Sequence, residues 1–231
     1  MRTVIIANGD PPGAEDVQRW LHPGDRLICA DGGARAALAL GLTPHAVVGD
    51  FDSLTERELA TLAERGATLH RYSPRKDETD LELALLHAVA GLPDETDQSA
   101  RAEIVILGAL GGRLDQTIAN VMLLAMPALA GARVWIARGN EACFLVTPDR
   151  PALLHGAAGD VVSLIPFGGD AHGVRTTGLE YPLCDESLFF GPARGVSNVL
   201  LGEHGEVCVR EGRLLCIHTT GSVSSEKQGG G

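Results

Sequence analysis

Residues 46–53 read Ala46-Val47-Val48-Gly49-Asp50-Phe51-Asp52-Ser53, an apolar run followed at once by a glycine and two aspartates. The apolar run predicts a buried strand, and two carboxylates at i and i+2 on an extended chain point to the same side. Because such carboxylates repel each other, we expect a hard divalent cation such as Mg²⁺ to offset their charge. The alternative is a turn before a helix, since Ser53 and Glu56 match the S-x-x-E capping box.

Strands and helices alternate over the first three-fifths of the chain. Apolar, β-branched runs predict strands over 3–7, 26–30, 46–48, 67–71, 103–107 and 133–137, and helical patterns predict helices over 15–21, 34–40, 55–65, 81–90 and 116–129. Thr79 and Glu82 form a second capping box before the helix over 81–90. This alternation predicts an α/β fold: a parallel, multiply wound α/β domain over residues 1–139.

The remainder of the chain has a different pattern. From residue 141, short apolar runs such as 161–165, 198–201, 206–210 and 214–218 are separated by Gly, Pro and Asp turns. This pattern is typical of a small all-β sandwich or barrel domain, which we place at 140–221. Residues 222–231 have the composition of a disordered tail.

Composition limits the classes of partner. The chain has 231 residues, 45% hydrophobic and 21% charged, with a net charge of -11, which argues against nucleic acid and anionic membranes as partners but suits a cationic substrate. The five cysteines are scattered without C-x-x-C spacing, so we expect reduced cysteines and a cytoplasmic protein. The apolar run at the N-terminus is too short for a signal peptide, and no segment reaches membrane-spanning length.

Four unusual loops follow predicted strands, at the edge where open α/β sheets bind ligands. They are 31–33, 49–53, 75–80 and 108–115, and they carry six aspartates together with Lys76 and Arg113. Glycine pairs before helices leave backbone amides open to an anion. The combination predicts a metal–nucleotide site, although neither the P-loop motif nor G-x-G-x-x-G is present.

Five ordered motifs are similar to those of the thiamine pyrophosphokinase family. They are Asp31-Gly32-Gly33-Ala34, Gly49 to Ser53, Lys76-Asp77-Glu78-Thr79-Asp80, Gly108 through Gln116, and Gly195-Val196-Ser197-Asn198. The resemblance implies transfer of a diphosphate from ATP to the hydroxyl of thiamine, with release of AMP. It also implies a homodimer with active sites at the subunit interface. Two positions depart from the family pattern, Val199 and Gln116, where an acidic residue and a histidine are expected.

Each motif then receives an expected role. We expect Asp50 and Asp52 to be the principal Mg²⁺ ligands, assisted by Asp80, and Asp80 or Asp115 to accept the proton of the thiamine hydroxyl. The remaining contacts to ATP are assigned to Asp31, Gly32, Gly33, Lys76, Thr79, Gly111, Gly112 and Arg113, with contact to the metal as the alternative for Asp31. Thiamine is assigned to Tyr181, Ser197 and Asn198 of the β domain, with Asp115.

Two other functions fit parts of this pattern. One is a diphosphotransferase acting on another primary alcohol, such as a pterin hydroxymethyl group, which has no need of Tyr181 and residues 195–198. The other is a nucleotide-binding module without activity, against which the joint presence of Asp50, Asp52, Asp80 and Arg113 argues.

Overall fold

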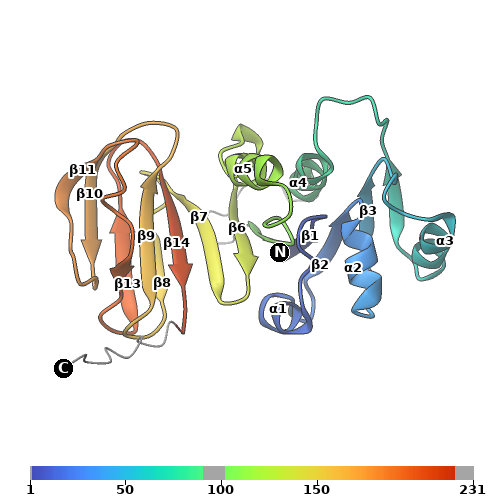
Figure 1. The fold of residues 1–231 in the computed structure, drawn as a ribbon, viewed down its shortest axis with the longest axis horizontal. Helices are drawn as coiled ribbons and strands as arrows, with labels where there is room; N and C mark the ends of the chain where they lie inside the picture. Colours follow the sequence, from blue (N-terminus) through green and yellow to red (C-terminus); the bar gives the residue numbers. More distant parts are fainter. Residues whose placement is uncertain (1, 91–101, 222–231) are drawn as a thin grey trace, which may run out of the picture. The chain divides into compact units, whose positions relative to one another are not determined.

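The structure is a computed structural model that describes residues 2–90 and 102–221. The chain divides into two compact units, residues 1–139 and 140–231, and each unit is described by itself (Figure 1). The tail predicted over 222–231 lies outside the described residues.

The first unit is built on a parallel sheet in the order β6-β5-β1-β2-β3-β4. Strands β1, β2, β3 and β5 are almost wholly buried, as expected for β-branched and leucine-rich strands covered on both faces. The strands are β1 (Arg2–Ile6), β2 (Arg26–Ala30), β3 (Ala46–Gly49), β4 (Thr68–Arg71), β5 (Ala102–Leu107) and β6 (Ala132–Arg138).

A helix follows each of the first five strands, which confirms the predicted multiply wound α/β fold. Helix α2 packs against β1 and β2, and α4 packs against β2 and β3. The helices are α1 (Ala14–Trp20), α2 (Gly33–Ala39), α3 (Glu56–Glu64), α4 (Asp80–Ala90) and α5 (Leu114–Leu123), and a 3-10 turn, η2 (Pro127–Leu129), follows α5.

Two predicted helix ends are wrong. Helix α3 is capped by Thr55 and Glu58 instead of Ser53 and Glu56: the Glu58 amide donates to Thr55 Oγ1 at 3.3 Å, and the Thr55 amide donates to Glu58 Oε2 at 2.7 Å. The helix predicted over 116–129 ends at Leu123, because Pro127 forces the preceding Met126 out of helical backbone (ψ 131°).

The second unit is all-β over its described residues, as predicted. Its strands form two antiparallel arrays, β12-β9-β14-β7 and β11-β10-β13-β8, and alternate side chains from both arrays share one apolar core that includes Leu164, Val174 and Val207. The strands are β7 (Glu141–Val146), β8 (Ala152–His155), β9 (Val161–Pro166), β10 (Ala171–Thr177), β11 (Cys184–Leu188), β12 (Asn198–Val199), β13 (His204–Cys208) and β14 (Leu214–Thr219).

Two global properties bear on the predictions from composition. All five cysteines have free thiols. Within residues 2–90 and 102–221, no helix combines the length and the apolar character needed to cross a membrane.

Candidate metal and nucleotide site

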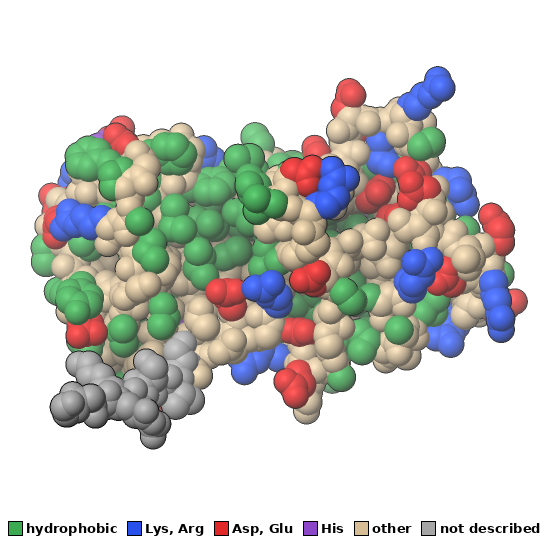
Figure 2. All heavy atoms as spheres, viewed as in Figure 1, with side chains coloured by type: hydrophobic (Ala, Val, Ile, Leu, Met, Phe, Trp, Pro, Cys, Tyr) green, Lys and Arg blue, Asp and Glu red, His purple; other side chains and the backbone are tan. Residues whose placement is uncertain are grey.

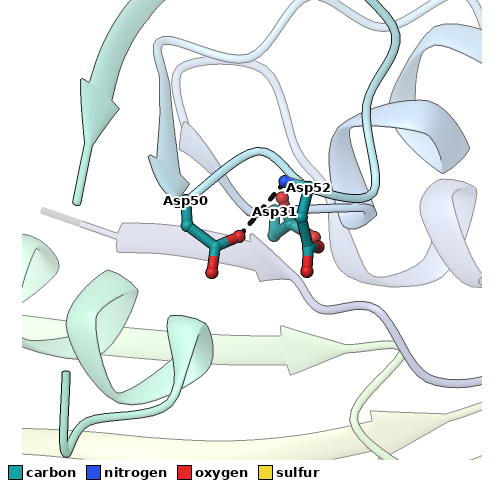
Figure 3. A group of neighbouring side chains, drawn as sticks. All are labelled: Asp31, Asp50 and Asp52. Carbon is teal, nitrogen blue, oxygen red and sulfur yellow. Dashed lines mark hydrogen bonds between the residues drawn. The ribbon is translucent and has the colours of Figure 1, made fainter. Parts of the chain in front are cut away.

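Three aspartates from two neighbouring loops converge at the carboxyl ends of β2 and β3 (Figure 3). Asp31, Asp50 and Asp52 each offer a carboxylate oxygen, and these three oxygens lie within 4.8 Å of one another. The backbone between Asp50 and Asp52 is not extended, because Phe51 has a φ of 68°. The shared direction of the two carboxylates therefore comes from a tight turn, which the Asp52 amide stabilises by donating to Asp50 Oδ1 at 3.1 Å.

Asp31 is the buried member of this acidic cluster (Asp31, Asp50 and Asp52). The residue is only 3% exposed, and its Oδ1 has no hydrogen-bond partner among the described residues. Burial raises the pKa of Asp31, and the charges of Asp80 and Asp52 raise it further, against hydrogen bonds from Ser53 and Gly32 that lower it. An orphaned carboxylate oxygen beside two others is the donor set that Mg²⁺ prefers, so the residues present fit this ion.

Lys76 supplies the positive charge beside the cluster. Its Nζ lies 2.9 Å from Asp80 Oδ1 and 3.5 Å from Asp50 Oδ2, and its side chain is 12% exposed. Burial alone would lower the pKa of Lys76, but the ion pairs with Asp80 and Asp50 raise it. Asp80, expected to assist in metal binding, is thus paired with Lys76, whereas Asp31 joins Asp50 and Asp52.

The two glycines at the start of α2 lie in close packing. A Cβ on Gly33 would lie 2.1 Å from the Ile6 carbonyl oxygen of β1, and one on Gly32 would lie 2.3 Å from Asn8 Oδ1. A side chain at Gly33 would push the start of α2 away from the sheet, whereas one at Gly32 would meet the end of the Asn8 side chain. Close approach of the backbone to β1 is therefore the first reason for Gly33.

The loop after β5 carries an exposed ion pair. Arg113 Nη2 lies 2.5 Å from Asp115 Oδ2, and the two side chains are 71% and 65% exposed. The Arg113 guanidinium lowers the pKa of Asp115. Gly111 has a φ of 85° and lies against the Asp10 carboxylate, while Gly112 has open space at its Cβ position. Because they are so exposed, the Arg113 and Asp115 side chains are accessible to a ligand.

The loop before α4 ends as the sequence predicts. The Glu82 amide donates to Thr79 Oγ1 at 3.2 Å, so Thr79 caps the helix. Asp77 in this loop is exposed to solvent.

The three β-domain residues assigned to thiamine lie together in the second unit, whereas the fourth, Asp115, belongs to the first unit. Asn198 Nδ2 donates to the Tyr181 carbonyl at 2.8 Å, and Asn198 Oδ1 accepts from the Tyr181 amide at 3.0 Å. Ser197 has a φ of 62°, and its amide donates to Ser163 Oγ at 3.0 Å. The Asn198 side chain thereby holds the backbone of Tyr181, a residue that is 65% exposed.

Sequence reasoning missed the residues that hold the 49–53 loop. Asn8 Nδ2 donates to Ser53 Oγ at 3.3 Å. Arg71 Nη1 donates to the Asp50 carbonyl at 3.1 Å and its guanidinium lies 4.8 Å from the centre of the Phe51 ring. Arg35 donates to the Ser53 carbonyl. The sequence signal that could have found two of them is their place relative to the strands. Asn8 lies just beyond the end of β1 and Arg71 is the last residue of β4, and both lie next to the acidic loop.

Comparison with protein families decides the assignment. Residues 17–136 match the thiamin pyrophosphokinase catalytic domain, and residues 152–214 match the thiamin pyrophosphokinase vitamin B1 binding domain. The chain belongs to the thiamine pyrophosphokinase family. Both family domains fall within the two units, one in each.

Individual family members agree over nearly the whole chain. A thiamine pyrophosphokinase of Bacillus subtilis is 29% identical over 221 residues, which cover 95% of this chain and 100% of the relative. The crystal structure of a Bacillus subtilis thiamine pyrophosphokinase superposes with a TM-score of 0.81 at 27% identity, covering 95% of this chain and 99% of that one. A Geobacillus thermodenitrificans structure gives a TM-score of 0.78 at 25% identity, covering 96% and 99%.

Proposed function

We propose that the protein transfers the diphosphate group of ATP to the hydroxyl of thiamine, giving thiamine diphosphate and AMP. Membership of the thiamine pyrophosphokinase family supports the reaction class. The observation that carries the proposal is the acidic cluster, where three carboxylate oxygens lie within 4.8 Å at the ligand-binding edge of the sheet. Such a concentration of negative charge is stable when a metal–triphosphate complex shares it.

Asp50 and Asp52 would hold Mg²⁺, with the orphaned Oδ1 of Asp31 as a third ligand and Asp80 close by. An ion held by these carboxylates would supply positive charge to offset that of the transferring phosphates. Lys76 and Arg113 would contact phosphate oxygens, and Gly32, Gly33, Gly111, Gly112 and Thr79 would line the ATP path. Positioning and charge stabilisation account for most catalysis in phosphoryl transfer.

The acceptor side of the reaction is assigned to the second unit. Tyr181 presents an exposed ring on backbone held by Asn198, which suits stacking on the flat aminopyrimidine of thiamine, while Ser197 and Asn198 form its polar border. Asp80 or Asp115 would accept the proton of the hydroxyl. The carboxylates of the proposed metal site suit the positive charge of the thiazolium.

We further propose a cytoplasmic homodimer with its active sites at the subunit interface. The free cysteines agree with a reducing compartment. On the face seen in Figure 2, charged side chains of both signs are interspersed over the first unit, and apolar side chains are prominent over the second. Helix α5 has no buried residue. Its apolar residues Leu114, Ile118 and Met122 follow one another at intervals of four and are 73%, 48% and 61% exposed. An exposed apolar stripe of this kind favours a subunit contact.

Isotopic labelling of ATP tests the reaction. With thiamine and Mg²⁺, a label on the β-phosphorus is expected to appear in thiamine diphosphate, and a label on the α-phosphorus only in AMP. Formation of ADP and thiamine monophosphate would contradict diphosphate transfer. Turnover with a hydroxymethylpterin but not with thiamine would reassign the acceptor, and tight ATP binding without AMP would favour a binding module.

A further inference from the structure

Two histidines in the second unit face each other across neighbouring strands. His155 ends β8 and His204 begins β13, and the two residues are directly paired in the antiparallel register. Their Nδ1 atoms are 3.1 Å apart and both side chains are exposed. The rings are nearly perpendicular, with an interplanar angle of 85° and centroids 5.1 Å apart. The two Nδ1 atoms therefore face each other at the surface.

The spacing matches that of two ligands on one metal ion. Zinc–imidazole bonds are about 2.0–2.1 Å long, so two nitrogens on a tetrahedral or octahedral ion stand roughly 2.9–3.4 Å apart. Without metal, an N–H···N hydrogen bond between opposite tautomers satisfies the same distance. The pair is thus already at chelating distance, and binding requires the donor imidazole to change tautomer, with its proton moving from Nδ1 to Nε2, and little movement of the backbone.

The surroundings favour a cation over an anion. Glu203 precedes His204, and Glu206 lies two residues along the same strand, so its side chain projects on the same face as His204. The chain as a whole carries a net charge of -11. Neutral imidazole selects Zn²⁺, Ni²⁺ and Cu²⁺ over Mg²⁺, which prefers oxygen. In its ligand chemistry this histidine pair differs from the acidic cluster of the first unit.

We propose that His155 and His204 form a surface site for a divalent transition-metal ion of the Zn²⁺ and Cu²⁺ class, with water completing the coordination. Because the ligands come from strands far apart in sequence, the ion would fasten β8 to β13 in the second unit. The site is independent of the proposed diphosphate transfer and does not rest on it.

Titration of the full chain with Cu²⁺ tests this site, since Cu²⁺ binds nitrogen ligands most strongly of the first-row divalent ions. Millimolar Mg²⁺ is present throughout to occupy the carboxylates. The wild type is expected to bind one Cu²⁺ per chain with a nitrogen-ligand electron paramagnetic resonance signal. His155→Ala and His204→Ala should each weaken binding by about 10²-fold, because one imidazole alone loses the chelate advantage.

His172→Ala is the matched control. His172 lies on β10 in the same sheet, but its Nδ1 is 2.8 Å from Ser187 Oγ, so its removal should leave Cu²⁺ affinity unchanged. Circular dichroism verifies that each variant is folded. Loss of the nitrogen signal only in the two paired variants supports the site. Equal binding by all four proteins, or no binding by the wild type, overturns the proposal and leaves the pair as a hydrogen bond.

Discussion

The positive charge of Lys76 offsets part of the negative charge at the acidic cluster. With its Nζ 2.9 Å from Asp80 and 3.5 Å from Asp50, it provides a counter-charge inside the protein. Mg²⁺ and a triphosphate would compete with this arrangement, since the ion attracts Asp50 and the phosphates attract Lys76. We therefore expect Lys76 to exchange its carboxylate partners for phosphate oxygens when substrate binds.

Replacement of this counter-charge has a measurable consequence. Lys76→Gln should lower the free energy of unfolding by about 1–2 kcal/mol without metal, because the ion pairs are partly buried. Added Mg²⁺ should then raise the melting temperature of the variant more than that of the wild type. Thermal unfolding with and without Mg²⁺ measures both effects, and Arg75→Gln, an exposed position in the same loop, is the control. Identical melting and identical Mg²⁺ response in Lys76→Gln and wild type would contradict this role.

Asn8 illustrates a residue whose effect is indirect. Its amide donates to Ser53 Oγ and packs beside Gly32, so it connects the loops after β1, β2 and β3. Asn8→Ala should reduce turnover by about tenfold through misplacement of the acidic loop, with a loss of stability near 1 kcal/mol. Steady-state kinetics with an unfolding curve provide the measurement. Full turnover in a folded Asn8→Ala protein would show that the hydrogen bond does not position the loop.

At the scale of the element, helix α3 depends on its first turn. The Glu58 carboxylate accepts a hydrogen bond from the Thr55 amide, and its Oε1 lies 2.7 Å from Arg35 Nε. The hydrogen bond with Arg35, followed by those with Thr55, lowers the pKa of Glu58 to about 2. A depressed folded-state pKa stabilises the fold above the unfolded pKa, and this contribution is lost as pH falls toward about 2.

Two substitutions test this cap. Thr55→Ala should cost about 1 kcal/mol, whereas Thr61→Ala, the same change inside α3, should cost less because alanine favours the helix interior. Glu58→Gln should destabilise the protein at neutral pH, with a deficit that shrinks as pH falls below about 4.5. Chemical denaturation at a series of pH values measures all three. A deficit that is constant with pH would exclude the Glu58 charge as its source.

The same elements show what sequence could and could not predict. Buried strands such as β3 and β5 are evident from their apolar runs, because central parallel strands need apolar residues on both faces. The cap of α3 was misplaced by two residues, since Ser53 and Thr55 both precede a glutamate by three positions and the motif alone does not decide between them.

The composition of the acidic cluster was also only partly predictable. Sequence placed the aspartates at one edge, but pairing of Asp80 with Lys76 depends on how far the 75–80 loop reaches. Asn8 and Arg71 carry no motif, and their contacts with the acidic loop arise only from strand order and register.

At the scale of the whole molecule, the exposed apolar stripe of α5 predicts a dimer. The wild type should have a mass in solution near twice the 24.2 kDa of the chain. Ile118→Glu should reduce the mass toward that of one chain, because a charge cannot be buried cheaply in an apolar contact. Light scattering reads the mass, and Gln116→Glu on the same helix is the control. A dimeric Ile118→Glu protein, or a monomeric wild type with full activity, would contradict this arrangement.

The proposed function depends on the proposed metal–nucleotide site in the first unit. The most direct test is the rate of thiamine-dependent AMP formation in wild type, Asp52→Asn and Asp77→Asn, the last an exposed aspartate outside the acidic cluster. We predict that Asp52→Asn lowers the rate by at least about 10²-fold with the fold retained, while Asp77→Asn stays near wild type. Wild-type turnover by Asp52→Asn would contradict the assignment of the cluster as the catalytic metal site.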